Sequence, residues 1–458
     1  MLVFKKFSTK LMEVEMKMKL LILIFFSSSI LMSQSKVGKI DFIEYDLPNG
    51  LHVILHEDHS APIVAVDIWY HVGSKNEDPE RTGFAHLFEH MMFQGSANVK
   101  KAEHMAYIQK AGGTFNASTS WDRTNYFQVV PSNQLELVLW LESDRMMSLN
   151  VNQENLDNQR EVVKEERRWR VDNRPYGTQW EETFKRLFKA HPYRWPVIGY
   201  MEHLNAATLD EVKKFFDTYY VPNNAVLVIA GDIDVEKTKK LVEKYFGDIP
   251  RGKYEIKRPN VVEPPMTQQV KDTIYDNIRL PAVFIAFRIP KDGEKDFYAL
   301  ELLSNILGSG KSSRLYQKLV YEKRIAQNVN VYAIGMEDAG VFKIDAYCSI
   351  GHTPEEVERE IWNEIEKIHT ELVFEKELQK AKNQIESRTI SSYQTVLQKA
   401  DQLAYYYVIH KNTNEINLEL DKILSITRED ISESAVRYLK PENSVVLYYL
   451  PREQRASK

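Results

Sequence analysis

Residues 219–228 read Tyr-Tyr-Val-Pro-Asn-Asn-Ala-Val-Leu-Val, and residues 438–447 read Tyr-Leu-Lys-Pro-Glu-Asn-Ser-Val-Val-Leu. The two stretches lie 219 positions apart, measured from Pro222 to Pro441. In each, a turn signal made of Pro and Asn leads into an apolar run typical of a buried strand. The repetition predicts two copies of one folding unit, each ending in such a strand.

Two further pairs of segments share this spacing. Thr208 and Thr427 each precede a carboxylate by three residues, the signature of a capped helix start. Residues 61–66 and 280–285 both carry a proline followed by apolar residues. Internal duplication explains all three pairs.

The boundary between the copies is predicted in a polar stretch at residues 251–268, which contains three prolines. Residues 36–250 then form an N-terminal domain and residues 269–458 a C-terminal domain.

The order of elements within the first copy is mixed. The apolar periodicity predicts strands at Asp41–Tyr45, Leu51–His56, Ile63–Tyr70, Phe115–Ser118 and Tyr126–Val130, and helices at Gly83–Met92, Lys101–Ala111, Glu136–Ser148 and Glu154–Val171. Strands and helices do not alternate one for one. The pattern therefore favours an α+β fold of two duplicated sandwich domains, each a largely antiparallel sheet with helices on one face, over a doubly wound sheet.

Composition narrows the function classes. The chain has 458 residues, 60 Lys and Arg against 65 Asp and Glu, and a net charge of -5, so no cationic surface for nucleic acid is indicated. A single cysteine, Cys348, cannot form an internal disulfide or a multi-thiolate metal site. Any metal must be held by histidine and carboxylate.

The N-terminus has the pattern of a secretory signal peptide, which we place at residues 1–35. Lys17 and Lys19 precede an apolar run from Leu20 to Phe26, and small residues follow. The run is too short for a stable membrane span, so an uncleaved anchor is the weaker interpretation and a buried helix the weakest. We expect an exported protein, periplasmic in a bacterium with two membranes.

The most informative residues are His86-Leu87-Phe88-Glu89-His90. On a helix, positions i and i+4 share a face, so His86 and His90 can bind one metal ion with Glu89 beside them. This spacing is the inverted zinc-peptidase motif His-x-x-Glu-His. Two surface histidines would be the simpler explanation, but the apolar residues around them leave almost no polar face on the helix.

Catalytic zinc takes three protein ligands and keeps a fourth position for water. The best candidates for the third ligand lie within residues 159–169, which contain Glu161, Glu165 and Glu166. The motif and this acidic stretch together resemble the pitrilysin group of metallopeptidases, which includes insulysin and the mitochondrial processing peptidase; in layout the chain is most similar to bacterial relatives of the latter. In that group the third ligand follows the second histidine by some 76 residues, which is Glu166 here; Glu165 is a poor second choice.

The resemblance covers nearly everything after residue 38 and implies further roles. Residues 112–126 look like the family's edge strand, where Asn116 and Ala117 would bind an extended peptide by strand addition; a simple hairpin is an equally good interpretation of the sequence alone. Members often carry a supporting glutamate seven residues before the third ligand. Here that position is Gln159, which can donate and accept hydrogen bonds but adds no charge.

The second copy lacks the metal-binding residues. Leu300, Leu303 and Ser304 stand opposite His86, Glu89 and His90, so the C-terminal domain is predicted to be metal-free.

The resemblance also implies an arginine and a tyrosine in the second copy that hold the substrate backbone. Val320 and Gln327 occupy those positions in this chain. We therefore expect a homologous, metal-free partner subunit that supplies the pair, giving a heterodimer in which each chain forms half of a chamber.

Residues 308–312, Gly-Ser-Gly-Lys-Ser, mimic the end of a nucleotide-binding loop. Asn305 stands where the first glycine is required, and a helical pattern precedes the loop where a strand is required. We therefore expect no ATP binding. The cluster Arg167, Arg168 and Arg170 is predicted to be a solvated or salt-bridged helix face.

The sequence thus predicts an exported zinc endopeptidase, with one Zn²⁺ per chain, that hydrolyses unfolded or short peptides. Glu89 would act as general base on a water activated by zinc at His86, His90 and Glu166. Two alternatives remain, a non-catalytic scaffold subunit of the same fold and a processing peptidase of narrow specificity.

Overall fold

The computed structural model describes residues 38–452. The predicted signal peptide at residues 1–35 lies outside this range. Lys39 and the described residues that follow it form one compact unit. No helix among the described residues is both long and apolar enough to cross a membrane.

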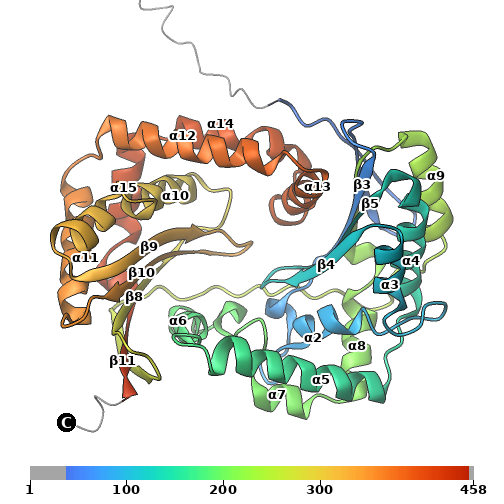
Figure 1. The fold of residues 1–458 in the computed structure, drawn as a ribbon, viewed down its shortest axis with the longest axis horizontal. Coiled ribbons are helices and arrows are strands. Elements are labelled where there is room, and N and C mark those ends of the chain that lie inside the picture. The colour runs from blue at the N-terminus through green and yellow to red at the C-terminus, as the bar shows by residue number, and fades with distance from the viewer. Residues whose placement is uncertain (1–37, 453–458) are drawn as a thin grey trace, which may run out of the picture. The chain divides into compact units, whose positions relative to one another are not determined.

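Two sheets organise the fold (Figure 1). The first has six strands in the order β1-β2-β6-β3-β5-β4: β1 (Ile43–Asp46), β2 (His52–Glu57), β3 (Ile63–Tyr70), β4 (Thr114–Thr119), β5 (Thr124–Pro131) and β6 (Ala225–Gly231). The second has five in the order β7-β11-β8-β10-β9: β7 (Val270–Asp276), β8 (Ala282–Ile289), β9 (Ala326–Ile334), β10 (Gly340–Cys348) and β11 (Ser444–Pro451).

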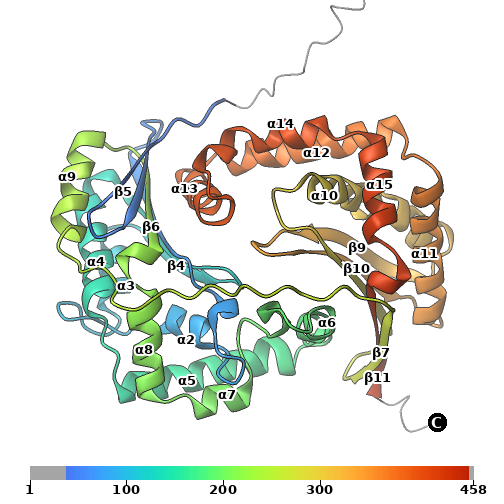
Figure 2. The same ribbon diagram turned by 180° about the vertical axis from the view of Figure 1, so that it is seen from behind.

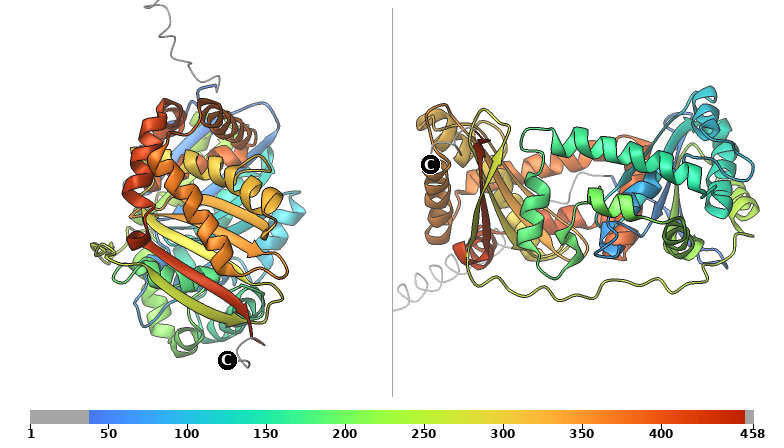
Figure 3. Two further views of the ribbon diagram at one scale, coloured as in Figure 1. Left: turned by 90° about the vertical axis from the view of Figure 1, so that its left-hand side faces the viewer. Right: turned by 90° about the horizontal axis from the view of Figure 1, so that it is seen from below.

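The two sheets have the same topology. If β2, β6, β3, β5 and β4 are matched with β7, β11, β8, β10 and β9, the strand orders coincide, and β1 is the one additional strand. Each sheet has a single parallel pair, β2 with β6 and β7 with β11, and the other pairs are antiparallel (Figure 3, left). The predicted α+β fold with two largely antiparallel sheets is confirmed.

The described residues contain fourteen α-helices. Those of the first half are α2 (Phe84–Met91), α3 (Glu103–Lys110), α4 (Leu135–Ser148), α5 (Gln153–Arg167), α6 (Gln179–Leu187), α7 (Met201–Ala206), α8 (Leu209–Tyr219) and α9 (Val235–Phe246). Those of the second half are α10 (Lys295–Gly308), α11 (Pro354–Thr370), α12 (Glu375–Ser392), α13 (Val396–Tyr405), α14 (Glu419–Ser425) and α15 (Arg428–Tyr438). Thr208 and Thr427 form capping boxes at the starts of α8 and α15.

One helix ends differently from the expectation. The periodicity predicts a helix to Val171, whereas α5 ends at Arg167 and the next five residues, Arg168–Asp172, adopt the wider π-helical turn. Over five residues, apolar periodicity cannot distinguish a period of 3.6 from a slightly larger one.

Alternate residues of the first sheet pack on opposite sides, as the pleat requires. Val66 and Ile229 belong to a core cluster shared with helices of their own half. Their neighbours Ala65 and Val228 instead pack against Leu403 of α13, a helix of the second half. The second face of this sheet is therefore covered from the other half of the chain.

The second sheet shows the reciprocal arrangement. Phe284 and Leu447 pack against Phe184 of α6, a helix of the first half. Phe184 and Leu403 are 219 positions apart, so α6 and α13 are themselves a duplicated pair. Each half thus covers one sheet face of the other. The sequence predicted helices on one face of each sheet. In the structure, the second face of each sheet is also covered, by α13 on the first sheet and α6 on the second.

The segment 251–268 contains no helix or strand and runs as an extended chain between α9 and β7 (Figures 2 and 3). Side-chain hydrogen bonds fix it at several points. Glu263 accepts backbone hydrogen bonds from Lys189, Ala190 and His191, all at 2.6–2.9 Å. Arg258 donates to the carbonyl of His71.

The exchanged helices predict that the two halves unfold together. Leu403→Ala removes a fully buried side chain between α13 and the first sheet, and should lower the free energy of unfolding by about 2–5 kcal/mol in a urea titration. The control Gln398→Ala, at an exposed position of α13, should change it by less than about 0.5 kcal/mol. Equal effects of the two substitutions would contradict the assigned packing.

Candidate metal centre

Helix α2 carries the predicted motif, and its first turn is fixed by a buried carboxylate. Glu77 accepts the backbone N–H groups of Gly83 and Ala85, both at 2.8 Å. These donors have no partner inside the helix, and a negative charge at a helix N-terminus is stabilised by the helix dipole. Gly83 has a φ of 95° and lies so close to Ile198 that no side chain fits. The start of α2 is thereby held in one place.

His86 and His90 lie one turn apart on α2, with ring centroids 5.0 Å apart, and face α5. Glu166 extends from α5 toward both rings. Its Oε2 lies 3.1 Å from Nε2 of His90 and 3.7 Å from Nε2 of His86. The three predicted ligands are therefore brought together, with ligand atoms within 4.8 Å of one another.

The arrangement fits a zinc ion. In a tetrahedral site with ligands at about 2.1 Å, neighbouring ligand atoms are about 3.4 Å apart, close to both measured separations. Two imidazole nitrogens and one carboxylate oxygen are the donors found in catalytic zinc sites that leave one position open.

The protonation states agree with this fit. Burial and the neighbouring His90 lower the pKa of His86 to about 4, so its imidazole is neutral near pH 7. Burial alone would raise the pKa of Glu166, but the hydrogen bond from His90 and the adjacent His86 and Arg170 bring it below its ordinary value. Metal ions bind the neutral form of imidazole and the ionised form of a carboxyl group, so both states suit metal binding.

Glu89 lies beside the three ligands. Its Oε2 accepts a hydrogen bond of 2.6 Å from the hydroxyl of Thr119, the last residue of β4. Burial raises the pKa of the Glu89 carboxyl above its ordinary value. A carboxylate whose pKa moves toward neutrality is better suited to accept and release a proton at neutral pH.

Arg170 binds the other oxygen of the predicted third ligand. Its Nη1 lies 2.7 Å from Oε1 of Glu166, one turn away through the π-helical segment. Glu165 points to solvent and pairs with Arg168, so it does not reach the site. All three arginines of the predicted face form salt bridges: Arg167 pairs with Glu181, Arg168 with Glu165 and Arg170 with Glu166.

Thr119 and Arg170 were not identified as site residues from the sequence. Arg170 offers a weak signal, four positions after Glu166, that its side chain can reach back to that carboxylate. Thr119 offers none, because only the pairing of β4 with β5 brings the end of the strand to α2.

The predicted substrate-binding residues lie on an outer strand. Asn116 and Ala117 belong to β4, which is the last strand of its sheet and contacts α2. The Asn116 side chain accepts the backbone N–H of Ala117 at 2.9 Å. Gln159, two turns before Glu166 on α5, is buried and donates to Asn158.

In the second half, Leu300, Leu303 and Ser304 are buried on α10. Val320 lies in the π-helical segment Tyr316–Glu322 and Gln327 on β9.

One other group of possible ligand atoms occurs among the described residues, Asp292, His410 and Glu419. Tyr405 donates to Asp292, and Tyr298 and Tyr406 donate to Glu419, so these carboxylates have protein partners.

Comparisons with known proteins agree with this geometry. A family described as insulinase (peptidase family M16) matches residues 52–190, and one described as peptidase M16 inactive domain matches residues 206–385. The zinc protease PqqE of Helicobacter pylori is 32% identical over 411 residues, covering 88% of this chain and 92% of that protein. The chain belongs to peptidase family M16. The resemblance to the pitrilysin group is thereby confirmed.

Other M16 relatives and structures extend the match. A zinc protease of Bacillus subtilis, YmxG, is 26% identical over 88% of this chain and 98% of its own length. A protease from Helicobacter pylori has a crystal structure with a TM-score of 0.86 at 31% identity, covering 90% of this chain and 100% of that one. The periplasmic protease PqqL of Escherichia coli shares the fold, with a TM-score of 0.76 at 18% identity, over 92% of this chain and 49% of its own.

The metal ligands of this M16 chain can be tested without measuring activity. Glu166→Ala, His86→Ala and His90→Ala should each lower the zinc content of the purified protein, measured by mass spectrometry, to less than about a tenth of one ion per chain. Glu165→Ala removes the same group one position away and should leave the zinc content unchanged. Full zinc content in Glu166→Ala would reassign the third ligand.

Proposed function

We propose that this M16 protein is an exported zinc endopeptidase that hydrolyses unfolded or short peptides. The supporting observation is the convergence of two imidazole nitrogens and one carboxylate oxygen on a single point, with the Glu89 carboxylate beside it. The names of the relatives, zinc proteases, agree with this chemistry.

Each residue of the site has one task. His86, His90 and Glu166 would hold the zinc ion, which would supply Lewis-acid activation of water and of the scissile carbonyl. Glu89 accepts the proton of the attacking water and passes it to the leaving amine. Thr119 fixes the Glu89 carboxylate by its hydrogen bond, and Arg170 holds the second oxygen of Glu166, so that one oxygen stays directed at the histidines.

The outer edge of β4 would bind the substrate. Backbone N–H and C=O groups on the free side of an edge strand can pair with an extended peptide of almost any sequence. Asn116 and Ala117 lie on this strand, and Thr119 at its end already touches Glu89. A peptide added to β4 would therefore pass next to the proposed base.

Glu89→Gln keeps the size of the side chain and removes the base. It should lower kcat for a fluorogenic peptide by at least about a hundredfold while zinc content stays at the wild-type level. Glu161→Gln, at an exposed position of α5, is the matched control and should leave kcat unchanged. Cleavage by Glu89→Gln at the wild-type rate would exclude Glu89 as the base.

A second subunit is part of the proposal. Val320 and Gln327 stand where the family resemblance implies an arginine and a tyrosine, and this chain matches about half the length of the periplasmic protease PqqL. We infer that a homologous chain without the zinc motif completes the site by supplying that pair. The apolar run from Leu20 to Phe26, preceded by Lys17 and Lys19, supports export to the compartment in which PqqL is found.

The partner requirement predicts a difference in activity between the isolated and the assembled enzyme. Addition of the homologous subunit should raise kcat/KM by about tenfold or more, because it contributes groups that hold the substrate backbone. Size-exclusion chromatography with light scattering should show a heterodimer. Full turnover by the isolated monomer would rule the partner out.

A further inference from the structure

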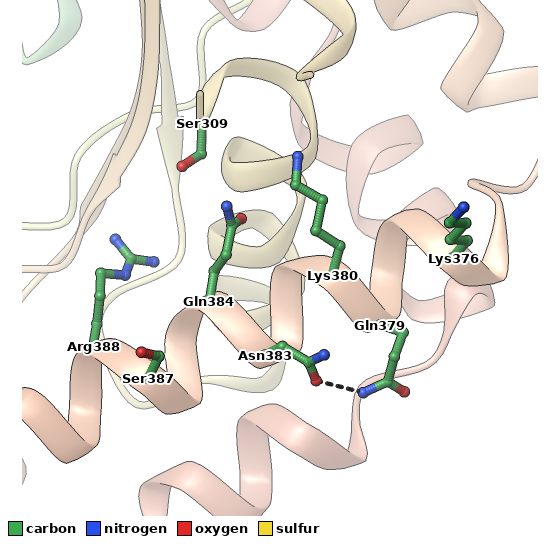
Figure 4. Close-up of a pocket in the computed structure, with 8 residues that line it drawn as sticks. All are labelled: Ser309, Lys376, Gln379, Lys380, Asn383, Gln384, Ser387 and Arg388. Atoms are coloured by element: carbon green, nitrogen blue, oxygen red, sulfur yellow. Dashed lines mark hydrogen bonds between the residues drawn. The ribbon is translucent and has the colours of Figure 1, made fainter. Parts of the chain in front are cut away.

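A cavity of ≈ 600 Å³ lies on α12, between this helix and the loop that follows α10 (Figure 4). All residues lining it are polar, and none is acidic. They comprise three cations, three amides and two hydroxyls: Lys376, Lys380, Arg388, Gln379, Asn383, Gln384, Ser309 and Ser387. In a chain with a net charge of -5, such a surface is a local exception.

The three cations are not neutralised by ion pairs within the described residues. Lys380 donates to the hydroxyl of Ser312 at 2.6 Å, and Arg388 to the side-chain oxygen of Asn305 at 2.9 Å. Of the nearby acids, Glu377 is held by a bidentate pair with Arg314.

Glu301 is an acid whose charge acts on Arg388. Burial and the adjacent Glu419 raise the pKa of Glu301 to about 7, so its charge is incomplete at neutral pH. The cavity therefore keeps a positive charge that an anionic ligand can neutralise.

The three cations and one of the amides follow one inclined ridge of the helix surface. Lys376, Lys380, Gln384 and Arg388 are spaced four residues apart, which places neighbours about 6 Å apart and the whole row along about 18 Å. Figure 4 shows Lys380, Gln384 and Arg388 directed to the same side, toward Ser309. In an extended peptide, alternate side chains are about 6.7 Å apart, and five or six residues span the same length.

The amides distinguish a peptide from a phosphate compound. The side-chain oxygen of Gln384 is buried and has no hydrogen-bond partner. An N–H of a bound peptide can satisfy this acceptor, whereas the oxygens of a phosphodiester carry no hydrogen to donate. The cations can pair with the carboxylates of an acidic peptide, and the unpaired Gln384 oxygen between them can accept one of its backbone N–H groups.

We propose that this face of α12 binds an extended peptide segment with acidic side chains at alternate positions. This proposal extends the proposed peptidase function, because it adds a second contact for acidic substrates away from the metal centre. Helix α12 contacts α10 in the second half as α5 contacts α2 in the first, so the duplicated counterpart of the metal-binding helix would carry a substrate-binding surface.

The test measures binding without turnover. The full-length chain carrying Glu89→Gln is titrated into a fluorescein-labelled peptide of alternating serine and glutamate, and fluorescence anisotropy is recorded at low and high salt. Lys376→Gln/Lys380→Gln should weaken binding about fivefold or more, since each exposed ion pair contributes modestly. The same peptide with glutamine for glutamate should bind more weakly and respond little to salt.

Lys213→Gln/Lys240→Gln is the matched control. It removes two exposed lysines from α8 and α9 and should leave the affinity unchanged. Equal affinities of the Lys376→Gln/Lys380→Gln protein and its parent would overturn the proposal, as would equal binding of the glutamate and glutamine peptides. Binding of inorganic tripolyphosphate or of anionic vesicles, with no binding of the acidic peptide, would also overturn it and assign the cavity to phosphate groups.

Cleavage assays separate this proposal from the proposed function. In the catalytically competent chain, Lys376→Gln/Lys380→Gln should raise KM for the glutamate peptide and leave kcat and the glutamine peptide unaffected. If the protein binds the acidic peptide through α12 but cleaves nothing, the surface stands and the peptidase function fails. If the protein cleaves both peptides, and the ratio of KM for the glutamate peptide to KM for the glutamine peptide is the same in the variant as in its parent, the peptidase function stands and the proposed binding surface on α12 is rejected.

Discussion

Each sheet of this protein has two apolar faces, and helices of its own half cover only one. The other face is closed by a single helix from the opposite half, α13 on the first sheet and α6 on the second. At about 25 cal/mol for each Å² of apolar surface removed from water, an uncovered sheet face would be too costly for a stable domain. The reciprocal exchange thus makes the two duplicated halves mutually dependent and explains why the described residues from Lys39 onward form one compact unit.

The metal centre depends on this frame. His86 and His90 lie on a helix whose first turn is fixed by the buried Glu77, and Glu166 on a helix that packs beside it. The chain that leaves α5 goes directly into the π-helical turn with Arg170 and then into the exchanged helix α6. The third ligand is therefore placed by the same segment that closes the second sheet. A shift of α6 would displace Glu166 relative to the histidines.

Much of this could be predicted from the sequence because the decisive patterns are local. The duplication, the two sheets and the grouping of His86, Glu89 and His90 follow from spacing along one chain. Glu166 needed the family resemblance, because no local pattern distinguishes it from Glu165. The exchange of α6 and α13 could not be predicted, since an amphipathic helix shows that one side is buried but not which sheet buries it. Thr119 was missed for the same reason, because its contact with Glu89 is set by strand pairing.

The two halves share a topology but differ at one pair of equivalent helix contacts, α2 with α5 in the first half and α10 with α12 in the second. In the first half the contact between α2 and α5 contains two imidazoles and a carboxylate; in the second the contact between α10 and α12 contains leucines, Ser304 and the Asn305–Arg388 hydrogen bond. Stability in both halves comes from the apolar sheet faces, which retained their pattern. The helix pairs were free to change, because neither a metal ion nor a polar contact there is needed to cover a sheet. Duplication of the fold therefore did not require duplication of the site, and the second helix pair could acquire cations where the first has metal ligands.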